Sequence, residues 1–131
     1  MYVRLLDFAV LFKLKYISGS CCWKVNVHSK TKNHVYTRHR NMFGYYEKEQ
    51  NLLNGKPHYT SVFSSGSLAI WFSSHNNWMI GTSNNRGTVR GYAYNDNNYN
   101  CPYTAAYDWK YWNNGWTKAG RGLTIWNQCT L

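Results

Sequence analysis

Apolar and polar residues alternate with a period of two along most of the chain. At residues 21–27, CCWKVNV, the side chains of Trp23, Val25 and Val27 would share one face and the polar residues between them the other. After the first fifteen residues, no stretch sustains the i, i+3, i+4, i+7 spacing of an amphipathic helix. We therefore expect a half-buried strand at residues 21–27. The basic, polar residues that follow predict a loop, or an exposed strand around residues 34–38.

Turn-forming residues divide the rest of the chain into short strand-like pieces. Asn54-Gly55 lies between two such pieces and predicts a hairpin. Clusters of Ser, Asn and Gly then separate the runs LAIWF, WMIG, TVRGYAY and LTIWNQC. Five or more short strands joined in this way predict an all-β domain, built as a small antiparallel meander or in a sandwich-like form.

Two tryptophans come directly after turns. Trp78 follows Asn76-Asn77, and Trp116 follows Asn114-Gly115. Each can fold back across its hairpin, onto Trp71 and Trp112 respectively, and such aromatic cross-strand pairs contribute on the order of 0.5 to 1 kcal/mol each. We therefore expect these tryptophans to serve mainly as scaffold.

The composition suits one folded domain with a strong positive charge. The 131 residues are 18% aromatic and only 15% charged, which argues against disorder. The net charge is +10, and ten of the fifteen Lys and Arg residues lie in the first 56 positions. This charge suits a polyanionic partner, either nucleic acid, an acidic glycan or an anionic membrane surface; alternatively it keeps an aromatic-rich protein in solution.

The four cysteines predict two disulfide bonds of a secreted domain. Adjacent Cys21 and Cys22 are poorly placed to bond to each other, so each would reach one of the other two. We favour Cys22 with Cys129 and Cys21 with Cys101. The cysteines lack Cys-x-x-Cys spacing and the five histidines show no metal-binding spacing, so we expect no metal and no cofactor.

Residues 1–20 have a separate character. Arg4, an apolar run and small residues near Ser20 follow the layout of a secretory signal, although Asp7 and two lysines interrupt the apolar run. We expect either a secretory leader or an N-terminal extension, followed by a single disulfide-linked β domain at residues 21–131. The run is too short for a transmembrane span.

An ordered set of motifs resembles a small extracellular module of secreted and cell-surface proteins from invertebrates and protists. The set covers residues 22–129 and consists of NGKPHY, LAIWFSSHNNWMIG, GYAY, CP, WKYWNNGW and LTIWNQC. The resemblance implies an extracellular β module with disulfides, often joined to adhesive or matrix domains. It supplies no catalytic residue.

No pattern in the chain indicates catalysis. There is no Gly-x-Ser-x-Gly, P-loop or dinucleotide motif. Glu47 and Glu49 could form a glycosidase-like pair only if they were suitably separated across a cleft, and we interpret them as surface charges.

The remaining hypotheses concern binding. The expected function is a non-enzymatic, extracellular binding, adhesive or structural module that presents Tyr, Trp and Asn to a glycan, to a protein or to copies of itself. A cationic effector acting on anionic membranes is the alternative, and single-stranded nucleic-acid binding ranks third. The candidate contact residues are Tyr99, Tyr103 and Tyr107 in the loop before the last hairpins, with Trp112 and Trp116 as weaker candidates.

Overall fold

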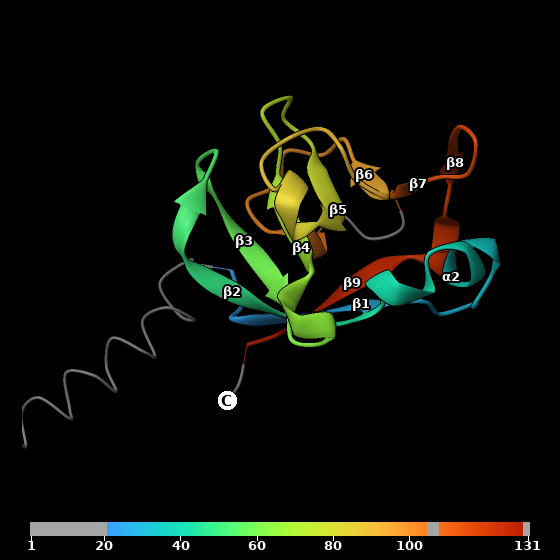
Figure 1. The fold of residues 1–131 in the computed structure, drawn as a ribbon, viewed down its shortest axis with the longest axis horizontal. Helices are drawn as coiled ribbons and strands as arrows, with labels where there is room; N and C mark the ends of the chain where they lie inside the picture. Colours follow the sequence, from blue (N-terminus) through green and yellow to red (C-terminus); the bar gives the residue numbers. More distant parts are fainter. Residues whose placement is uncertain (1–20, 105–107, 130–131) are drawn as a thin grey trace, which may run out of the picture.

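A single curled sheet of nine antiparallel strands makes up most of the molecule (Figure 1). The computed structural model describes residues 21–104 and 108–129, so the leader or extension expected at residues 1–20 lies outside the described residues. Strands β1 to β8 follow one another across the sheet in chain order, and β9 returns to pair with β1. The predicted all-β antiparallel meander is confirmed.

The strands are short, and most connections contain turns or single helical turns. Their bounds are β1 Lys24–His28, β2 Gly44–Leu53, β3 Lys56–Ser61, β4 Leu68–Phe72, β5 Trp78–Thr82, β6 Ala93–Asn95, β7 Lys110–Trp112, β8 Trp116–Lys118 and β9 Thr124–Gln128. The helical pieces are α2 His34–Arg38 and the 3-10 turns η1 Arg40–Met42, η2 Ser64–Gly66, η3 Ser83–Asn85, η4 Pro102–Thr104 and η5 Gly120–Gly122.

The predicted first strand and the predicted hairpin are both present. Val25 and Val27 are buried on the core side of β1. In the β2–β3 hairpin, Asn54 and Gly55 both have positive φ angles, of 52° and 81°, as a two-residue turn matched to the strand twist requires.

The segment at residues 34–38 is a helical turn, α2, so the expectation of a loop or exposed strand was wrong. The Asn33 side chain accepts a hydrogen bond from the backbone N–H of Val35 at 3.2 Å, which caps the turn. Val35 is fully buried beneath it, and the Tyr36 ring lies 5.2 Å from the Phe43 ring. The burial of one side chain and one cap outweigh the strand preference of the β-branched residues here. The helix was not predicted because five residues are too few for a helical repeat of apolar positions to be recognised.

The sheet has two differently covered faces. One face carries the main core, which includes Ile70, Trp78 and Ile80. The other face carries a small cluster of Ala69, Trp71 and Met79. This cluster lies beside the β5–β6 connection, whose Thr88 carbonyl accepts a hydrogen bond from the Trp71 indole at 2.8 Å.

The expected pairing of Trp78 with Trp71 was wrong. In the register of β4 and β5, Phe72 lies opposite Trp78 and Trp71 lies opposite Met79. Neighbouring residues of a strand point to opposite faces, so Trp71 and Trp78 are on different sides of the sheet. Trp78 instead packs edge-on against Phe72, with ring centroids 5.5 Å apart.

Both predicted disulfides are confirmed. Cys21 bonds Cys101 and Cys22 bonds Cys129, over sequence separations of 80 and 107 residues. The two bridges fix the start of β1 to η4 and to the end of β9. Within the described residues, no helix is long and apolar enough to cross a membrane.

Candidate ligand-binding site

The last four strands of the meander present a row of side chains on the face opposite the main core. Met79 lies opposite Tyr94, and Tyr94 opposite Lys110, which lies opposite Lys118 on the edge strand β8. Because residues two apart on a strand share a face, Trp112 on β7 and its partner Trp116 on β8 belong to this same face.

Three aromatic rings pack edge to face on this surface, which we call the aromatic shelf: Tyr94, Trp112 and Trp116. The Trp116 ring lies 4.7 Å from Tyr94 and 5.3 Å from Trp112, with interplanar angles of 84° and 74°. The predicted pair of Trp112 with Trp116 is thereby confirmed. Edge-to-face contact holds the rings in fixed positions while Trp112 and Trp116 stay 45% and 42% exposed.

Two depressions flank the shelf. The first, of about 370 Å³, is lined by Trp116 and Tyr94 together with His75, Asn77, Val89 and Asp96. The second, of about 350 Å³, shares Tyr94 and Asp96 and adds Asn97, Asp108, Lys110 and Lys118. Each volume lies at the lower end of the range of small-molecule sites.

The polar wall of the second depression is held by side-chain hydrogen bonds. The buried Asn95 Oδ1 accepts from the backbone N–H of Asn97 at 2.9 Å and from its side-chain amide at 2.7 Å. The Asn97 amide also lies 3.4 Å from Asp108 Oδ2. These bonds form a turn that leaves the intervening Asp96 exposed at the rim shared by the two depressions.

Trp109 forms part of the second depression and is almost fully buried. Its indole N–H has no acceptor among the described residues. A buried donor left unpaired costs about 1–3 kcal/mol, and because Trp109 packs in the main core, its indole nitrogen is out of reach of a ligand in the depression.

The arrangement can recognise a polyhydroxylated ring. Exposed indole and phenol faces contact the C–H surface of such a ring, carboxylate and amide oxygens accept from its hydroxyls, and ammonium groups donate to them. The Lys110 ammonium lies 5.5 Å from the Tyr94 ring, which leaves it close to the shelf.

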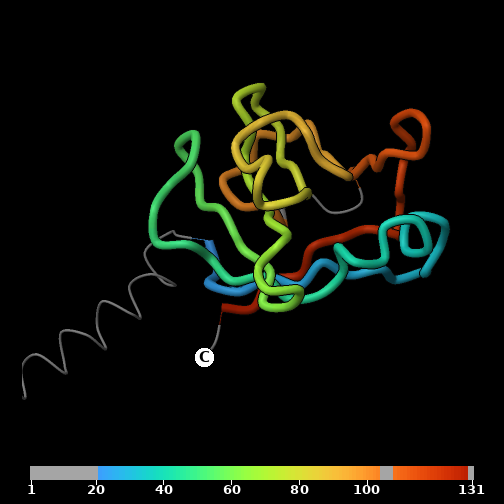
Figure 2. Tube along the Cα trace, in the orientation of Figure 1, coloured from blue at the N-terminus to red at the C-terminus, as the bar shows by residue number. Residues whose placement is uncertain are grey.

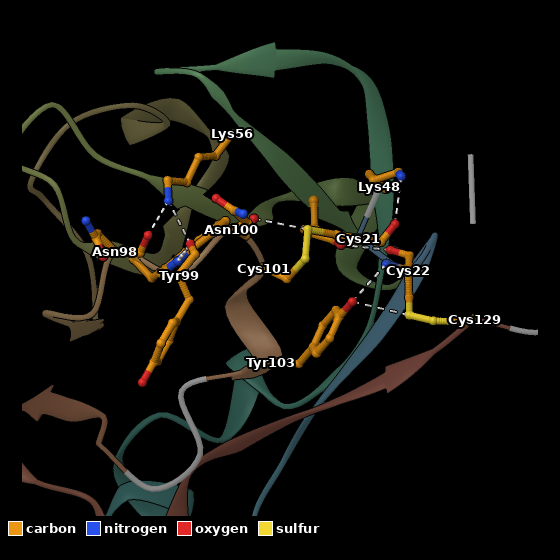
Figure 3. Close-up of a disulfide and its surroundings, with 12 residues drawn as sticks. Cys21, Cys22, Lys48, Lys56, Asn98, Tyr99, Asn100, Cys101, Tyr103 and Cys129 are labelled. Carbon is orange, nitrogen blue, oxygen red and sulfur yellow. Dashed lines mark hydrogen bonds between the residues drawn. A yellow bond between two sulfur atoms is a disulfide. The ribbon is translucent and has the colours of Figure 1, made fainter. Parts of the chain in front are cut away.

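The tyrosine loop has a different role from that of the shelf residues. Tyr103 is half-buried, and its hydroxyl accepts a hydrogen bond from the Cys22 backbone N–H at 3.3 Å, so it points at the disulfides (Figure 3). The Tyr99 carbonyl accepts from Lys56 Nζ at 2.8 Å and from the Trp78 indole at 2.9 Å, while the residue as a whole is 46% exposed. Neither tyrosine is among the residues that line the two depressions, and Tyr107 lies outside the described residues.

Sequence reasoning missed the residues that complete the site. Of the residues at this site, the sequence analysis named only Trp112 and Trp116; Tyr94 of the shelf, and Asp96, Asn97 and Asp108 beside it, were not among the candidates. The missing signal was register: Tyr94 ends up beside the tryptophans only because β6 pairs with β7. The polar run NDNN directly after a strand was the available hint.

A second polar network lies on β2 and β3, away from the shelf. The Arg86 guanidinium donates to His58 Nδ1 at 2.7 Å and to Thr60 Oγ1 at 3.0 Å. Thr60 in turn donates to Glu49 Oε2 at 2.6 Å, and His58 Nε2 donates to Asn51 Oδ1 at 3.0 Å. Burial and the Arg86 charge lower the pKa of His58, with Glu49 opposing them. Glu49 is thus a partner in a structural network.

Comparison with protein-family models, curated proteins and solved structures gives no match for this chain. Among the described residues, no cluster of three or more His, Cys, Asp or Glu side chains has the arrangement of a metal site.

Proposed function

We propose that this chain is a non-enzymatic, secreted glycan-binding module whose ligand lies on the aromatic shelf. The observation that carries the proposal is the shelf itself, where two half-exposed indoles and Tyr94 lie between depressions lined by carboxylates, amides and lysines. Aromatic area held in place before binding reduces the entropy lost on binding. The motif resemblance to extracellular modules supports the same class of function.

The disulfides support the secreted setting. Two bridges that join the first described residues to positions 101 and 129 form and persist in an oxidising compartment. Glycans are abundant ligands outside the cell, and a rigid β scaffold with exposed Tyr, Trp and Asn is a common way to present contact residues.

The test uses affinity electrophoresis in gels containing soluble neutral polysaccharides: a mixed-linkage β-glucan, a mannan, a galactan and a xylan. At least one should retard the protein, and the retardation should persist at 0.5 M NaCl because a neutral polysaccharide carries no charge whose attraction salt could screen. An aromatic anchor at the centre of an interface contributes about 2 kcal/mol, so Trp116→Ala should weaken binding roughly thirty-fold.

Trp126→Ala is the matched control. Trp126 lies on β9 and is 52% exposed, similar to Trp116, but it lines neither depression. Its removal should leave retardation unchanged. Absence of retardation in every gel, or equal losses in the two variants, would contradict the proposal. Binding only to anionic vesicles or to single-stranded DNA would favour the membrane or nucleic-acid alternative instead.

A further inference from the structure

One end of the molecule gathers exposed cations without an acid among them. The end is built from the β1–α2 loop, α2, η1 and η5, and we call it the basic end: Lys30, Lys32, Arg38, Arg40 and Arg121, all exposed. A backbone hydrogen bond of 3.0 Å from Lys30 to the Arg121 carbonyl joins the two chain segments. Figure 2 shows these segments side by side. Neither residues 29–43 nor residues 110–123 contain an aspartate or glutamate.

The cations are held close together. Lys32 Nζ lies 5.6 Å and Arg40 Cζ lies 5.4 Å from the centre of the same Tyr36 ring. The Asn33 amide donates to the Ala119 carbonyl at 3.2 Å, which ties α2 to the start of η5. Grouped like charges repel one another, and an anionic ligand relieves that repulsion while it gains attraction from each cation.

We infer that the basic end binds acidic polysaccharide, so that the glycan of the proposed function is one that carries sulfate or carboxylate groups. The inference deepens the proposed function and rests on it. The β7–β8 hairpin connects the two surfaces: the shelf is on one side of it, and α2 is on the other. His34 Nδ1 lies 2.9 Å from the Tyr111 hydroxyl, and His39 Nε2 donates to the Trp112 carbonyl at 2.7 Å. A linear chain on the shelf can therefore continue over the sheet edge at β8 onto the basic end.

The structure favours a polysaccharide over the other polyanions. The basic end itself offers nucleic acid no exposed Tyr, Trp or Phe on which a base could stack, because its Tyr36 ring is flanked by Lys32, Arg40 and Phe43. Membrane binding needs apolar side chains that can enter the lipid. Within the segments of the basic end, all of which are described, no large hydrophobic side chain is exposed.

The experiment measures binding of the full chain to immobilised dextran sulfate, with unsulfated dextran as the uncharged polymer, between 50 and 200 mM NaCl. Binding to dextran sulfate should exceed binding to dextran and should fall roughly 10²-fold over this range if about four cations engage sulfates. The pairs Lys32→Gln with Arg40→Gln and Lys30→Gln with Arg121→Gln should each lower the salt-dependence slope by about two. Two double variants are used so that, if one of them fails to fold, the other still tests the inference.

The matched control is Lys24→Gln with Arg90→Gln, which removes the same charge from other parts of the surface. The inference is overturned if this control weakens binding as much as the basic-end pairs, or if a single-stranded oligonucleotide or anionic phosphatidylserine vesicles bind more tightly than dextran sulfate at equal salt. Failure of the proposed function shows separately, as loss of neutral-polysaccharide retardation. The basic-end variants should leave that retardation intact, and Trp116→Ala should weaken the binding behind it roughly thirty-fold.

Discussion

We predict that the stabilisation from the two disulfides is not additive, because both bridges begin at neighbouring residues. Because Cys21 and Cys22 are neighbours, both bridges begin at nearly the same place in the chain. The perturbation is removal of each bridge by paired Cys→Ala substitution, first Cys21 with Cys101, then Cys22 with Cys129, and finally all four.

Loop-closure entropy gives the magnitude. In the chain-entropy model, separations of 80 and 107 residues correspond to about 4.5 and 4.8 kcal/mol for a bridge formed alone. With one bridge closed, the other restricts only the segment of about 28 residues from Cys101 to Cys129, which corresponds to about 3.5 kcal/mol. Losing either bridge should thus cost about 3.5 kcal/mol. Losing both should cost about 8 kcal/mol, roughly 1 kcal/mol more than the sum of the single losses.

The assay is urea unfolding followed by the fluorescence of the buried indoles Trp71, Trp78 and Trp109. A domain is stable by about 5–15 kcal/mol, so each single-bridge variant should still fold and the four-residue variant should be marginal or unfolded at 25 °C. Equal m-values would show that the same surface is exposed in each transition. A four-residue variant that loses no more free energy of unfolding than a single-bridge variant would refute the reasoning.

Two further outcomes follow from packing and charge. Burial and the Arg86 charge lower the folded-state pKa of His58 below its ordinary 6.5, so neutral His58 favours the folded state fully above about pH 6.5, and this contribution is lost as the pH falls toward the lowered pKa. The melting temperature should therefore fall less between pH 7 and pH 5 in His58→Gln than in the wild type. Equal falls in melting temperature would contradict this. A Cβ on Gly81 would lie 2.9 Å from the Gly91 Cα and 3.0 Å from the Trp71 ring. Gly81→Ala should therefore lower the free energy of unfolding, measured in urea, by about 1–3 kcal/mol. A loss below about 0.5 kcal/mol would show that the β5–β6 connection moves to make room for the methyl group.

Local features of the sequence were sufficient to predict the first strand, the first hairpin and the presence of two disulfides. Alternation identified Val25 and Val27 as buried residues of β1, and Asn54-Gly55 identified a hairpin, because both signals act between residues close in the chain. Because two adjacent cysteines rarely bond to each other, one of the three disulfide pairings could be excluded. The sequence did not decide between the other two, and the favoured pairing is the one that the structure has.

Features set by tertiary contacts were not predicted. The turn at α2 depends on the burial of Val35 and on contacts of Asn33 with Ala119, a residue far away in the chain. The faces of Trp71 and Trp78 depend on the register of β4 with β5, and a shift of one residue reverses every side chain. The site was incompletely predicted for the same reason, since Tyr94 reaches the tryptophans only through strand pairing.

The aromatic shelf and the basic end are joined by the β7–β8 hairpin, which is the part of the sheet with the least backbone pairing. Strands β7 and β8 are three residues each, and β8 is an edge strand, so backbone pairing alone gives the shelf little support. The additional support comes from the other side of the hairpin, where His34 and His39 of the helical segment bond the Tyr111 hydroxyl and the Trp112 carbonyl. The helical segment at residues 34–42, which carries Arg38 and Arg40 of the basic end, is therefore also the part of the chain that positions the shelf. Neutralising exposed cations should spare the shelf, whereas removing the histidines should disturb it.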